Sequence, residues 1–373
     1  MSEQHLHIIT HDVPYPADFG GVIDLFYKII SLHKLGVKIH LHCFVSKRSK
    51  QEVLNKYCES VNYYKRKKLS GFSLTIPFIV KSRIDKNLLN NLQKDNYPIL
   101  FEGIHTTYHL HQNLFAWRKV FLRLHNVEHK YYEQLAKIES NFIKKLYYKH
   151  EAALLKKYEK SIANKAIIIS VSIEDTQFYK KEFHSRSIIF LPVFLPHERV
   201  QIFLARGSYC LYHGNLSINE NEQAAIWLIE QVYNDLQIPL IIAGRNPSKK
   251  LKKIAQQNRF VSIVSNPTEV NMQLLIQHAQ LNVLPSLNKT GVKLKLLNAL
   301  YNGRHCILNN AGTEGSGLDE LCTIVETENS FKDEIEKLFK QEFTTKEMQY
   351  RSTALKKLYN NEQSAQIIID MLS

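Results

Sequence analysis

A lysine-bearing turn between an apolar strand and a helix is the segment of this chain best suited to chemistry. An apolar run at 281–285 leads through a polar loop to Gly291, and a helical pattern then carries Lys293 and Lys295 near its start. The first turn of a helix has backbone N–H groups without partners inside the helix, and such groups bind anions. The spacing predicts a diphosphate held by backbone donors and a lysine. The alternative is an ordinary strand–turn–helix connection with surface lysines.

Other glycine-bearing loops also follow predicted strands. They are Gly20-Gly21, His213-Gly214-Asn215 and Gly244-Arg245. In open α/β sheets, ligands bind outside the carboxyl ends of the strands. These loops are therefore expected to line one cleft together with the Thr290-Gly291 turn.

The alternation of strands and helices that positions these loops occurs twice. A strand at His5–Thr10, a helix from Val22 to Leu35 closed by Gly36, and a strand at Val37–Phe44 form a first βαβ unit. The first series continues with strands at 98–102, 119–124 and 166–171 and a long charged helix at 141–164. The second series has strands at 210–212, 240–244, 260–264, 281–285 and 306–308 and helices at 222–233 and 292–301. Residues 331–373 have a helical pattern throughout.

Two domains are expected from the 373 residues, since domains typically have about 100–200 residues each. Pro192 and Pro196 break the periodicity between the two series. We predict an N-terminal domain at 1–192, a C-terminal domain at 193–350, and a helical segment at 351–373 that packs back on the N-terminal domain. Both domains are predicted to be doubly wound parallel sheets.

Composition is that of a globular protein with a strong basic excess. The formal net charge is +14, and hydrophobic residues make up 44% of the chain. A basic excess favours anionic partners such as nucleic acid, a phospholipid surface or a nucleotide-sugar. Five cysteines without metal-clip spacing indicate reduced thiols in a cytoplasmic protein. A signal peptide and an apolar run long enough to span a membrane are both missing from the sequence pattern.

Histidines are numerous, but their spacing does not indicate a metal site. His5 and His7 lie two apart on one predicted strand, as do His40 and His42 on another, and such histidines are usually structural. A second group, His125 and His129 with Glu128 between them, follows a strand and lacks a third ligand nearby. We interpret His125 as a cleft residue and His129 as structural.

The segment 63–83 combines a basic run beside tyrosines with a following apolar stretch. Basic residues that flank apolar ones suit an anionic membrane surface or a lipid-phosphate acceptor. The alternative is a solvated loop followed by a buried helix. Nucleic-acid binding is not expected, because neither an aromatic platform nor a recognition helix is recognisable.

Taken together, these segments resemble the retaining GT-B glycosyltransferases of the GT4 type. The segment 283–303 resembles the donor-binding motif of that family, with its Val-Leu-Pro strand end and its Lys-Leu-Lys-Leu-Leu helix. Further likenesses, in the same order along the chain, are Pro14-Tyr15-Pro16 with Gly20-Gly21, Arg123–His129, His213–Leu216, Ile242–Arg245 and Ala311–Gly315. The likeness spans about residues 8–318.

The resemblance implies a GT-B fold, in which two Rossmann-like domains face a cleft, with 1–192 on the acceptor side and 193–350 binding the nucleotide-sugar donor. His125 would lie near the reacting sugar as the catalytic residue. The donor-binding residues would be Gly20, Gly21, Gly214, Asn215, Arg245, Thr290, Gly291, Lys293, Asn298, Glu314 and Gly315. Asn215 and Lys293 would contact the diphosphate, and Glu314 and Gly315 the sugar or the nucleotide. The transferred sugar would keep its anomeric configuration, without a metal ion or cofactor.

One position departs from the family pattern. The family usually has a glutamate, which bonds the donor ribose, where this chain has Asn298, and a second acidic position falls on Thr290. An amide bonds a hydroxyl more weakly than a carboxylate does. We expect a hexosyltransferase-type enzyme of surface-polysaccharide or lipid-linked glycan assembly, cytoplasmic and peripheral on the inner face of the cell membrane. A non-catalytic nucleotide-sugar-binding or scaffold protein and a polyanion-binding protein are the alternatives.

Overall fold

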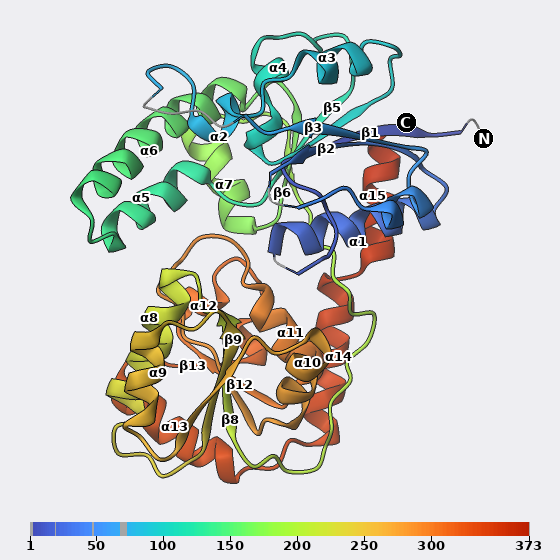
Figure 1. Cartoon of the computed structure of the whole chain (residues 1–373). Coiled ribbons are helices and arrows are strands. Elements are labelled where there is room, and N and C mark those ends of the chain that lie inside the picture. Colours follow the sequence, from blue (N-terminus) through green and yellow to red (C-terminus); the bar gives the residue numbers. More distant parts are fainter. Residues whose placement is uncertain (1–2, 19, 47, 68–72, 373) are drawn as a thin grey trace. The chain divides into compact units, whose positions relative to one another are not determined.

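The computed structural model describes residues 3–18, 20–46, 48–67 and 73–372, and these fall into two compact units (Figure 1). The N-terminal unit is Met1–Pro196 together with Tyr359–Ser373, and the C-terminal unit is His197–Leu358. The sequence places the boundary after residue 192. The structure places it after Pro196, because Val193, Phe194 and Leu195 are buried with the N-terminal unit.

Seven parallel strands form one sheet among the described residues of the N-terminal unit, in the order β3-β2-β1-β4-β5-β6-β7. Their bounds are β1 (His5–Thr10), β2 (Lys38–Val45), β3 (Ser60–Lys65), β4 (Ile99–Glu102), β5 (Val120–Leu124), β6 (Ile167–Ser170) and β7 (Ile188–Phe190). The strand order reverses between β1 and β4, so a ligand site is expected at the carboxyl ends of these two strands. The parallel doubly wound sheet predicted from the sequence is confirmed.

The interpretation of the first part of the basic segment as a solvated loop was wrong. Ser60–Lys65 is strand β3, which pairs in parallel with β2, and not a solvated loop. Tyr64 is buried in one core cluster while Tyr63 packs, partly buried, against another, so successive side chains point to opposite faces of the sheet as they do on a strand. The basic side chains obscured that alternation in the sequence.

Helices cover both faces of the N-terminal sheet. They are α1 (Gly20–Lys34), α2 (Phe78–Lys81), α3 (Lys86–Leu92), α4 (Tyr108–His111), α5 (Glu128–Ile138), α6 (Phe142–Ile162), α7 (Ile173–Glu182) and α15 (Asn361–Leu372). On one face, Leu25 and Ile29 of α1 share a core with Ile368 of α15, and on the other Leu155 of α6 packs with Leu88 of α3. As predicted, Gly36 ends α1 with a positive φ of 88° that a glycine adopts without strain.

Six parallel strands form the sheet of the C-terminal unit within the described residues, in the order β10-β9-β8-β11-β12-β13. They are β8 (Cys210–Asn215), β9 (Leu240–Arg245), β10 (Val261–Ser265), β11 (Leu281–Val283), β12 (His305–Leu308) and β13 (Thr323–Ile324). The helices are α8 (Asn219–Trp227), α9 (Lys249–Gln256), α10 (Glu269–His278), α11 (Leu294–Asn302), α12 (Asn310–Thr313), α13 (Glu328–Lys340) and α14 (Thr345–Leu358). The order reverses between β8 and β11.

The helical pattern at the end of the chain is divided between the two units. α13 and α14 belong to the C-terminal unit, whereas α15 packs against α1 in the N-terminal unit. The chain passes from one unit to the other between Leu358 and Tyr359. The sequence pattern predicts helix across this point because residues on both sides of it are helix formers.

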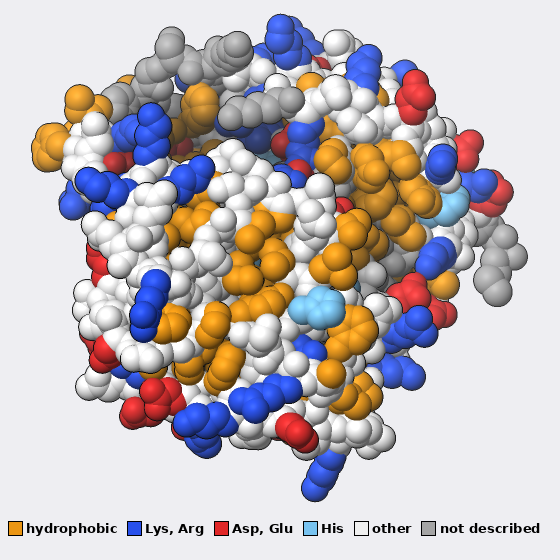
Figure 2. All heavy atoms as spheres, turned by 60° about the horizontal axis from the view of Figure 1, so that its bottom comes forward, with side chains coloured by type: hydrophobic (Ala, Val, Ile, Leu, Met, Phe, Trp, Pro, Cys, Tyr) orange, Lys and Arg blue, Asp and Glu red, His pale blue; other side chains and the backbone are white. Residues whose placement is uncertain are grey.

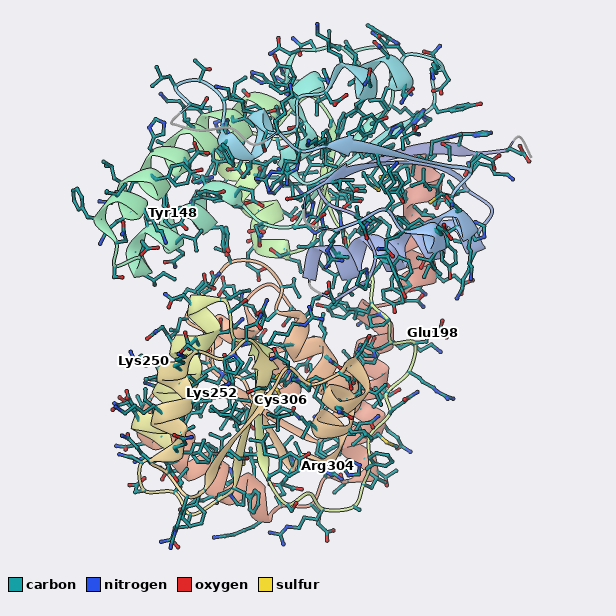
Figure 3. All side chains as sticks on the ribbon, viewed as in Figure 1. Tyr148, Glu198, Lys250, Lys252, Arg304 and Cys306 are labelled. Atoms are coloured by element: carbon teal, nitrogen blue, oxygen red, sulfur yellow. The ribbon has the colours of Figure 1, made fainter. Side chains whose placement is uncertain are left out.

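The basic excess is distributed widely. Lys250 and Lys252 of α9 are exposed and point away from the sheet, as Figure 3 shows. On the face shown in Figure 2, lysine and arginine side chains are scattered among polar and apolar ones and do not form one continuous patch. Cys306, by contrast, lies in the interior on β12 (Figure 3), and all five cysteines are free thiols. Among the described residues, no helix combines the length and apolar character required to cross a bilayer.

Candidate functional site

Two glycine-bearing loops of the C-terminal unit are held together by strand pairing. Gly214 lies opposite Gly244 in the β8–β9 ladder, and Asn215 lies opposite Arg245. A Cβ atom added to Gly244 would lie 2.0 Å from the carbonyl oxygen of Gly214, so only glycine fits at this approach. The structure thus brings together the predicted residues Gly214, Asn215 and Arg245 at one edge of the sheet.

The loop after β11 is shaped by its own hydrogen bonds. The side-chain oxygen of Asn288 accepts bonds from the backbone N–H of Thr290 at 2.8 Å and from its hydroxyl at 2.9 Å. Gly291 follows with a positive φ of 66°, and Lys293 Nζ donates to the carbonyl oxygens of Thr290 at 2.6 Å and Gly291 at 2.7 Å. These contacts fold the predicted residues Thr290, Gly291 and Lys293 into one compact turn.

Helix α11 begins directly after that turn. Lys293 is its N-cap residue, and the Lys293 side chain does not cap it. The first backbone N–H groups of the helix and its dipole therefore lie beside a lysine ammonium group, which is the combination that attracts an anion.

A second lysine of this helix is partly buried at the same edge. Lys295 Nζ lies 3.4 Å from the side-chain oxygen of Asn221 and 4.9 Å above the ring of Tyr212. Burial, and then the charge of Lys293, lower the pKa of Lys295 to about 8. Burial also lowers the pKa of His213, at the end of β8, to about 3, so this imidazole is neutral. The side chains that favour an anion here thus include Lys295 as well as Lys293.

The remaining predicted residues of this unit also follow strands of the same sheet. Asn298 lies one turn into α11, where its side-chain oxygen accepts a bond of 2.8 Å from Asn302. Glu314 and Gly315 follow α12, which begins just after β12. Asn309 ties the end of β12 to the loop after β11, since it exchanges two hydrogen bonds of 2.9 Å with the backbone of Ser286.

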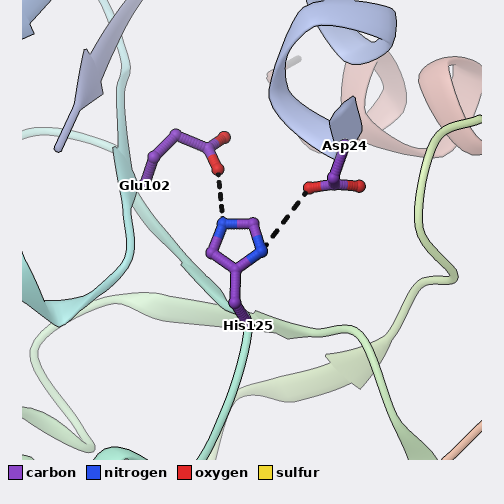
Figure 4. Close-up of side chains that lie close together, drawn as sticks. All are labelled: Asp24, Glu102 and His125. Carbon is purple, nitrogen blue, oxygen red and sulfur yellow. Dashed lines mark hydrogen bonds and ion pairs between the residues drawn. The ribbon is translucent and has the colours of Figure 1, made fainter. Parts of the chain in front are cut away.

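The predicted catalytic residue lies at the corresponding edge of the N-terminal unit. His125 follows β5, and its Nε2 atom lies 3.1 Å from Oε2 of Glu102 at the end of β4. Its Nδ1 atom lies 3.9 Å from Oδ2 of Asp24 on α1. Figure 4 shows the imidazole between the two carboxylates. The side chain of His125 is 15% exposed, whereas those of both carboxylates are buried.

Two buried cations balance these carboxylates. Lys28 Nζ lies 2.7 Å from Glu102 and 3.0 Å from Asp24, and Arg123 donates to both oxygens of Asp24, at 2.9 Å and 3.2 Å. Burial alone would raise the pKa of Asp24, but Arg123 and Lys28 hold it well below its usual value. The pKa of Glu102 is lowered in the same way, against the effect of burial, by Lys28 and His125. The cluster holds His125 in a fixed orientation.

The trio Asp24, Glu102 and His125 is also the group of described residues whose ligand atoms lie close enough to hold a metal ion. The two carboxylates already have charge partners in Lys28 and Arg123. An additional dication would lie beside two buried cations, which is electrostatically unfavourable. We therefore assign these carboxylates to the positioning of His125.

Two more histidines lie next to His125. The ring of His11, after β1, is stacked 5.0 Å from that of His105 and lies 6.3 Å from that of His125. Burial lowers the pKa of His11 to about 3 and that of His105 well below its usual value. A Cβ on Gly21 would lie 3.6 Å from the His11 ring, so the predicted glycine loop lies beside this histidine group. Gly20 is the first residue of α1.

Sequence reasoning missed Asp24, Lys28 and Glu102. Asp24 and Lys28 lie four residues apart on an otherwise apolar helix face. Opposite charges at this spacing on a buried face indicate an ion pair. Glu102 ends an apolar strand immediately before a glycine. These signals were present, but nothing in the sequence connects α1 with β4 and β5. The residue interpreted as structural, His129, is buried and bonded through Nδ1 to Glu159 at 2.6 Å.

The segment 63–83 has two structural roles. Residues 68–72 lie outside the described residues. Of the apolar stretch, Ile79 and Val80 are buried in the core, so they cannot contact a membrane. The basic part lines a groove of about 620 Å³ at the carboxyl ends of β2 and β3. Its lining residues include Lys50, Lys65, Arg66, Lys67, Tyr63 and Phe78.

Comparison with known proteins identifies the C-terminal unit. Residues 207–341 match the family model of the glycosyl transferases group 1. The C-terminal unit is therefore similar in sequence to the glycosyl transferases group 1. A protein of Klebsiella pneumoniae described as an uncharacterized 44.6 kDa protein in the cps region is 28% identical over 331 residues, which is 83% of this chain and 84% of that protein.

Solved glycosyltransferase structures show the same fold over the whole chain. The chain matches TarM of S. aureus with a TM-score of 0.71 at 11% identity, over 99% of this chain and 100% of the other. It matches WaaG, a glycosyltransferase involved in lipopolysaccharide biosynthesis, with a TM-score of 0.66 at 12% identity, and HepE of Anabaena, solved with UDP and glucose, with a TM-score of 0.67 at 11% identity. Each of these two matches covers 99% of both chains. The predicted GT-B fold is confirmed.

Proposed function

We propose that this chain is a retaining glycosyltransferase that moves a sugar from a nucleotide-diphosphate-sugar to a glycan or lipid-linked acceptor. The observation that carries the proposal is the start of α11, where the first turn of the helix carries Lys293 and Lys295 in the segment that matches the group 1 family. The Klebsiella relative from a cps region supports a role in cell-surface polysaccharide biosynthesis. The proposed reaction takes place on the cytoplasmic side, with the enzyme peripheral on the inner face of the cell membrane.

In the proposed reaction the donor diphosphate binds at the Thr290–Lys293 turn. The bond between the sugar and the β-phosphate oxygen breaks while the acceptor hydroxyl attacks from the same face, so the sugar keeps its anomeric configuration. The acceptor proton passes to the departing phosphate oxygen. Helix N–H groups and the two lysines stabilise the charge that develops on the diphosphate, and preorganised groups of this kind supply a large part of enzymatic rate enhancement. We propose that this reaction needs no metal ion.

His125 is the proposed catalytic residue on the acceptor side. The hydrogen bond to Glu102 fixes its ring, and the neighbouring charges are balanced by Lys28 and Arg123. A fixed imidazole can bond a sugar hydroxyl without first reorganising. This group and the α11 turn belong to different units, and we propose that both contribute to the transfer.

The basic groove at the ends of β2 and β3 favours an acceptor that carries a negative charge. Arg83 links the groove to the histidine group, since its Nε atom donates to the backbone of His11 at 3.1 Å. The charge of Arg66, which lines the groove, contributes with burial to lowering the pKa of Arg83 to about 9. An acceptor phosphate or carboxylate would relieve this accumulation of positive charge. We therefore propose that the acceptor has an anionic group a short distance from the hydroxyl that reacts.

A panel of nucleotide-sugars tests the proposal. The purified chain is mixed with UDP-, GDP-, ADP- and TDP-sugars in turn, and the melting temperature and nucleotide release are measured. A donor is expected to raise the melting temperature by mass action, and slow hydrolysis is expected to release its nucleotide even without acceptor. If no member of the panel binds or is hydrolysed, the proposal is overturned.

A second candidate function is a non-catalytic protein that binds a nucleotide-sugar as a scaffold. Asn298 favours it, because the side chain is an amide at the position where a ribose-binding carboxylate is expected, and Asn302 already donates to its oxygen. The variant N298E separates the two functions. A gain in donor affinity with no turnover favours the scaffold, whereas turnover in the unmodified chain excludes it.

A further inference from the structure

The turn between α5 and α6 exposes a cluster of large apolar side chains. Phe142 is 77% exposed, Ile143 73% and Leu146 54%, and Ile138 at the end of α5 is 38% exposed. Single exposed apolar residues are common on protein surfaces. Here four lie within nine residues: Leu146 is a neighbour of Phe142 and Ile143 on α6, four and three positions away, and Ile138 ends the helix just before them. We refer to Ile138, Phe142, Ile143 and Leu146 as the apolar tip.

The apolar tip is a defined structure at the outer end of a helix pair. α5 and α6 lie side by side at the left edge of the N-terminal unit in Figure 1. The side chain of Asn141 caps α6 by accepting a bond of 3.1 Å from the N–H of Lys144, and Asn141 N–H donates to Glu139 at 2.9 Å. Only the later turns of α6 reach the core, through Leu155 and Tyr158. The sequence therefore places apolar residues on the first turns of α6 that packing within the chain does not require.

The charge around the apolar tip has one predominant sign. Four lysines surround it, namely Lys137, Lys144, Lys145 and Lys149. The two acidic residues of α6, Glu151 and Glu159, are both buried, so the exposed side of this helix carries only basic charge. Two acidic residues lie near the tip: Glu133 on α5 and Glu139 in the turn. Tyr148, half-buried on α6 (Figure 3), adds an aromatic ring of the kind found at membrane interfaces.

Exposed apolar residues surrounded by lysines are complementary to a partner with an apolar interior and an anionic surface. We propose that the α5–α6 turn docks on an anionic lipid bilayer, with the apolar tip inserted among the acyl chains and the lysines beside the lipid phosphates. Insertion of apolar side chains and attraction of basic ones to anionic lipids act together in such binding. This surface is distinct from the segment 63–83, for which the sequence also suggested membrane contact; there Leu74 is exposed but Ile79 and Val80 are buried. The inference stands independently of which sugar the enzyme transfers.

Co-sedimentation with lipid vesicles tests the proposal on the full chain. Vesicles of phosphatidylcholine with about one third phosphatidylglycerol are compared with phosphatidylcholine alone, and binding is expected only to the anionic vesicles. The double variant F142S/L146S should bind about tenfold or more weakly, because it removes two inserted side chains. In K144Q/K145Q/K149Q each lost lysine should weaken binding by about fivefold, which corresponds to about 1 kcal/mol per residue.

The matched control is V270S/L274S. Val270 and Leu274 lie four apart on α10 and are 69% and 44% exposed, but their helix carries no lysine or arginine. This variant should bind vesicles like the unmodified chain, and all variants should keep the unmodified melting temperature because the altered side chains are exposed. The proposal is overturned if F142S/L146S binds anionic vesicles undiminished. It is equally overturned if neutral vesicles bind as well, or if the apolar tip instead forms a dimer whose mass in light scattering is halved by F142S/L146S.

Discussion

The carboxyl edges of the two sheets hold charged groups in opposite ways. At the N-terminal edge, Asp24 and Glu102 are matched by Lys28 and Arg123, all four are buried, and His125 is bonded into the set. At the C-terminal edge, the turn before α11 is built from glycine, backbone donors and two lysines, and its residues are partly exposed. The first edge is electrostatically satisfied by its own residues, whereas the second retains positive charge for a ligand.

This difference indicates what each edge contributes. Buried, paired charges fix geometry, because breaking such a pair leaves an uncompensated charge in the interior. Partly exposed lysines at a helix start give little stability of their own, but they strengthen the binding of an anion. Substitutions at the N-terminal edge should therefore change stability most, and substitutions at the C-terminal edge should change ligand affinity.

The largest effect is expected for D24N. This variant removes the charge that balances Arg123 and lies beside Lys28, and loss of one partner of a buried ion pair costs about 3–5 kcal/mol. Urea unfolding, followed by a probe of the N-terminal unit, measures the loss. The control is D235N, since Asp235 is 67% exposed in its pair with Lys332 and its loss should change the free energy of unfolding by less than about 1 kcal/mol. Equal effects of the two variants would contradict the comparison of the two edges.

Acid should destabilise the N-terminal unit next most strongly. His42 is buried, and burial and the neighbouring His7 lower its folded-state pKa to about 3, while an unfolded histidine titrates near 6.5. The unfolded state therefore binds the proton first, and stability is lost as the pH falls below about 6.5, at about 1.4 kcal/mol per pH unit for each such histidine.

Urea unfolding at pH 7, 6 and 5 measures that slope. H42Q should reduce the dependence of the unfolding free energy on pH by the contribution of one histidine. H33Q, which replaces an exposed histidine of α1, should leave that dependence unchanged. A slope that H42Q does not alter would show that other groups dominate the acid response.

At the C-terminal edge, K293M should weaken the binding of a nucleoside diphosphate by about tenfold or more, with little change in stability. A loss of this size corresponds to the free energy of one charge-assisted hydrogen bond. Isothermal titration with the nucleotide found in the donor panel measures this effect. K250M is the control, because Lys250 is an exposed lysine of α9 outside the turn (Figure 3). A loss of stability without a loss of affinity would assign Lys293 a structural role.

The smallest effect concerns pH at the same turn. Because the pKa of Lys295 is about 8, its positive charge is present below that pH and is lost above it. Nucleotide affinity should therefore fall a few-fold between pH 7 and pH 9, and K295M should remove most of this dependence. The same titration repeated across that pH range tests the point. An unchanged pH dependence in K295M would exclude Lys295 from the proposed site.

The fold was largely predictable because its signals are local. Each of these signals depends on neighbours within a few residues. Examples are the alternation in β1, the helical pattern of α1 with its end at Gly36, and the strand–turn–helix sequence around Lys293. Prediction was weaker where local signals conflict. The lysines and arginine at 65–68 hid strand β3, and the short strands β7 and β13 lack enough residues for a clear period.

The sequence by itself determined the strand–helix order, the glycine turns after the strands and the lysines that begin α11, because each depends on residues close together in the chain. Only the tertiary structure decided that Asp24, Glu102 and His125 share one site, and that residues 193–196 and α15 join the N-terminal unit. The tertiary structure also decided that four large apolar side chains are exposed together at the α5–α6 turn, whereas Ile79 and Val80 of the segment 63–83 are buried. The physical reason is that burial and charge pairing depend on contacts between segments far apart in the chain, and no local pattern specifies which segments meet.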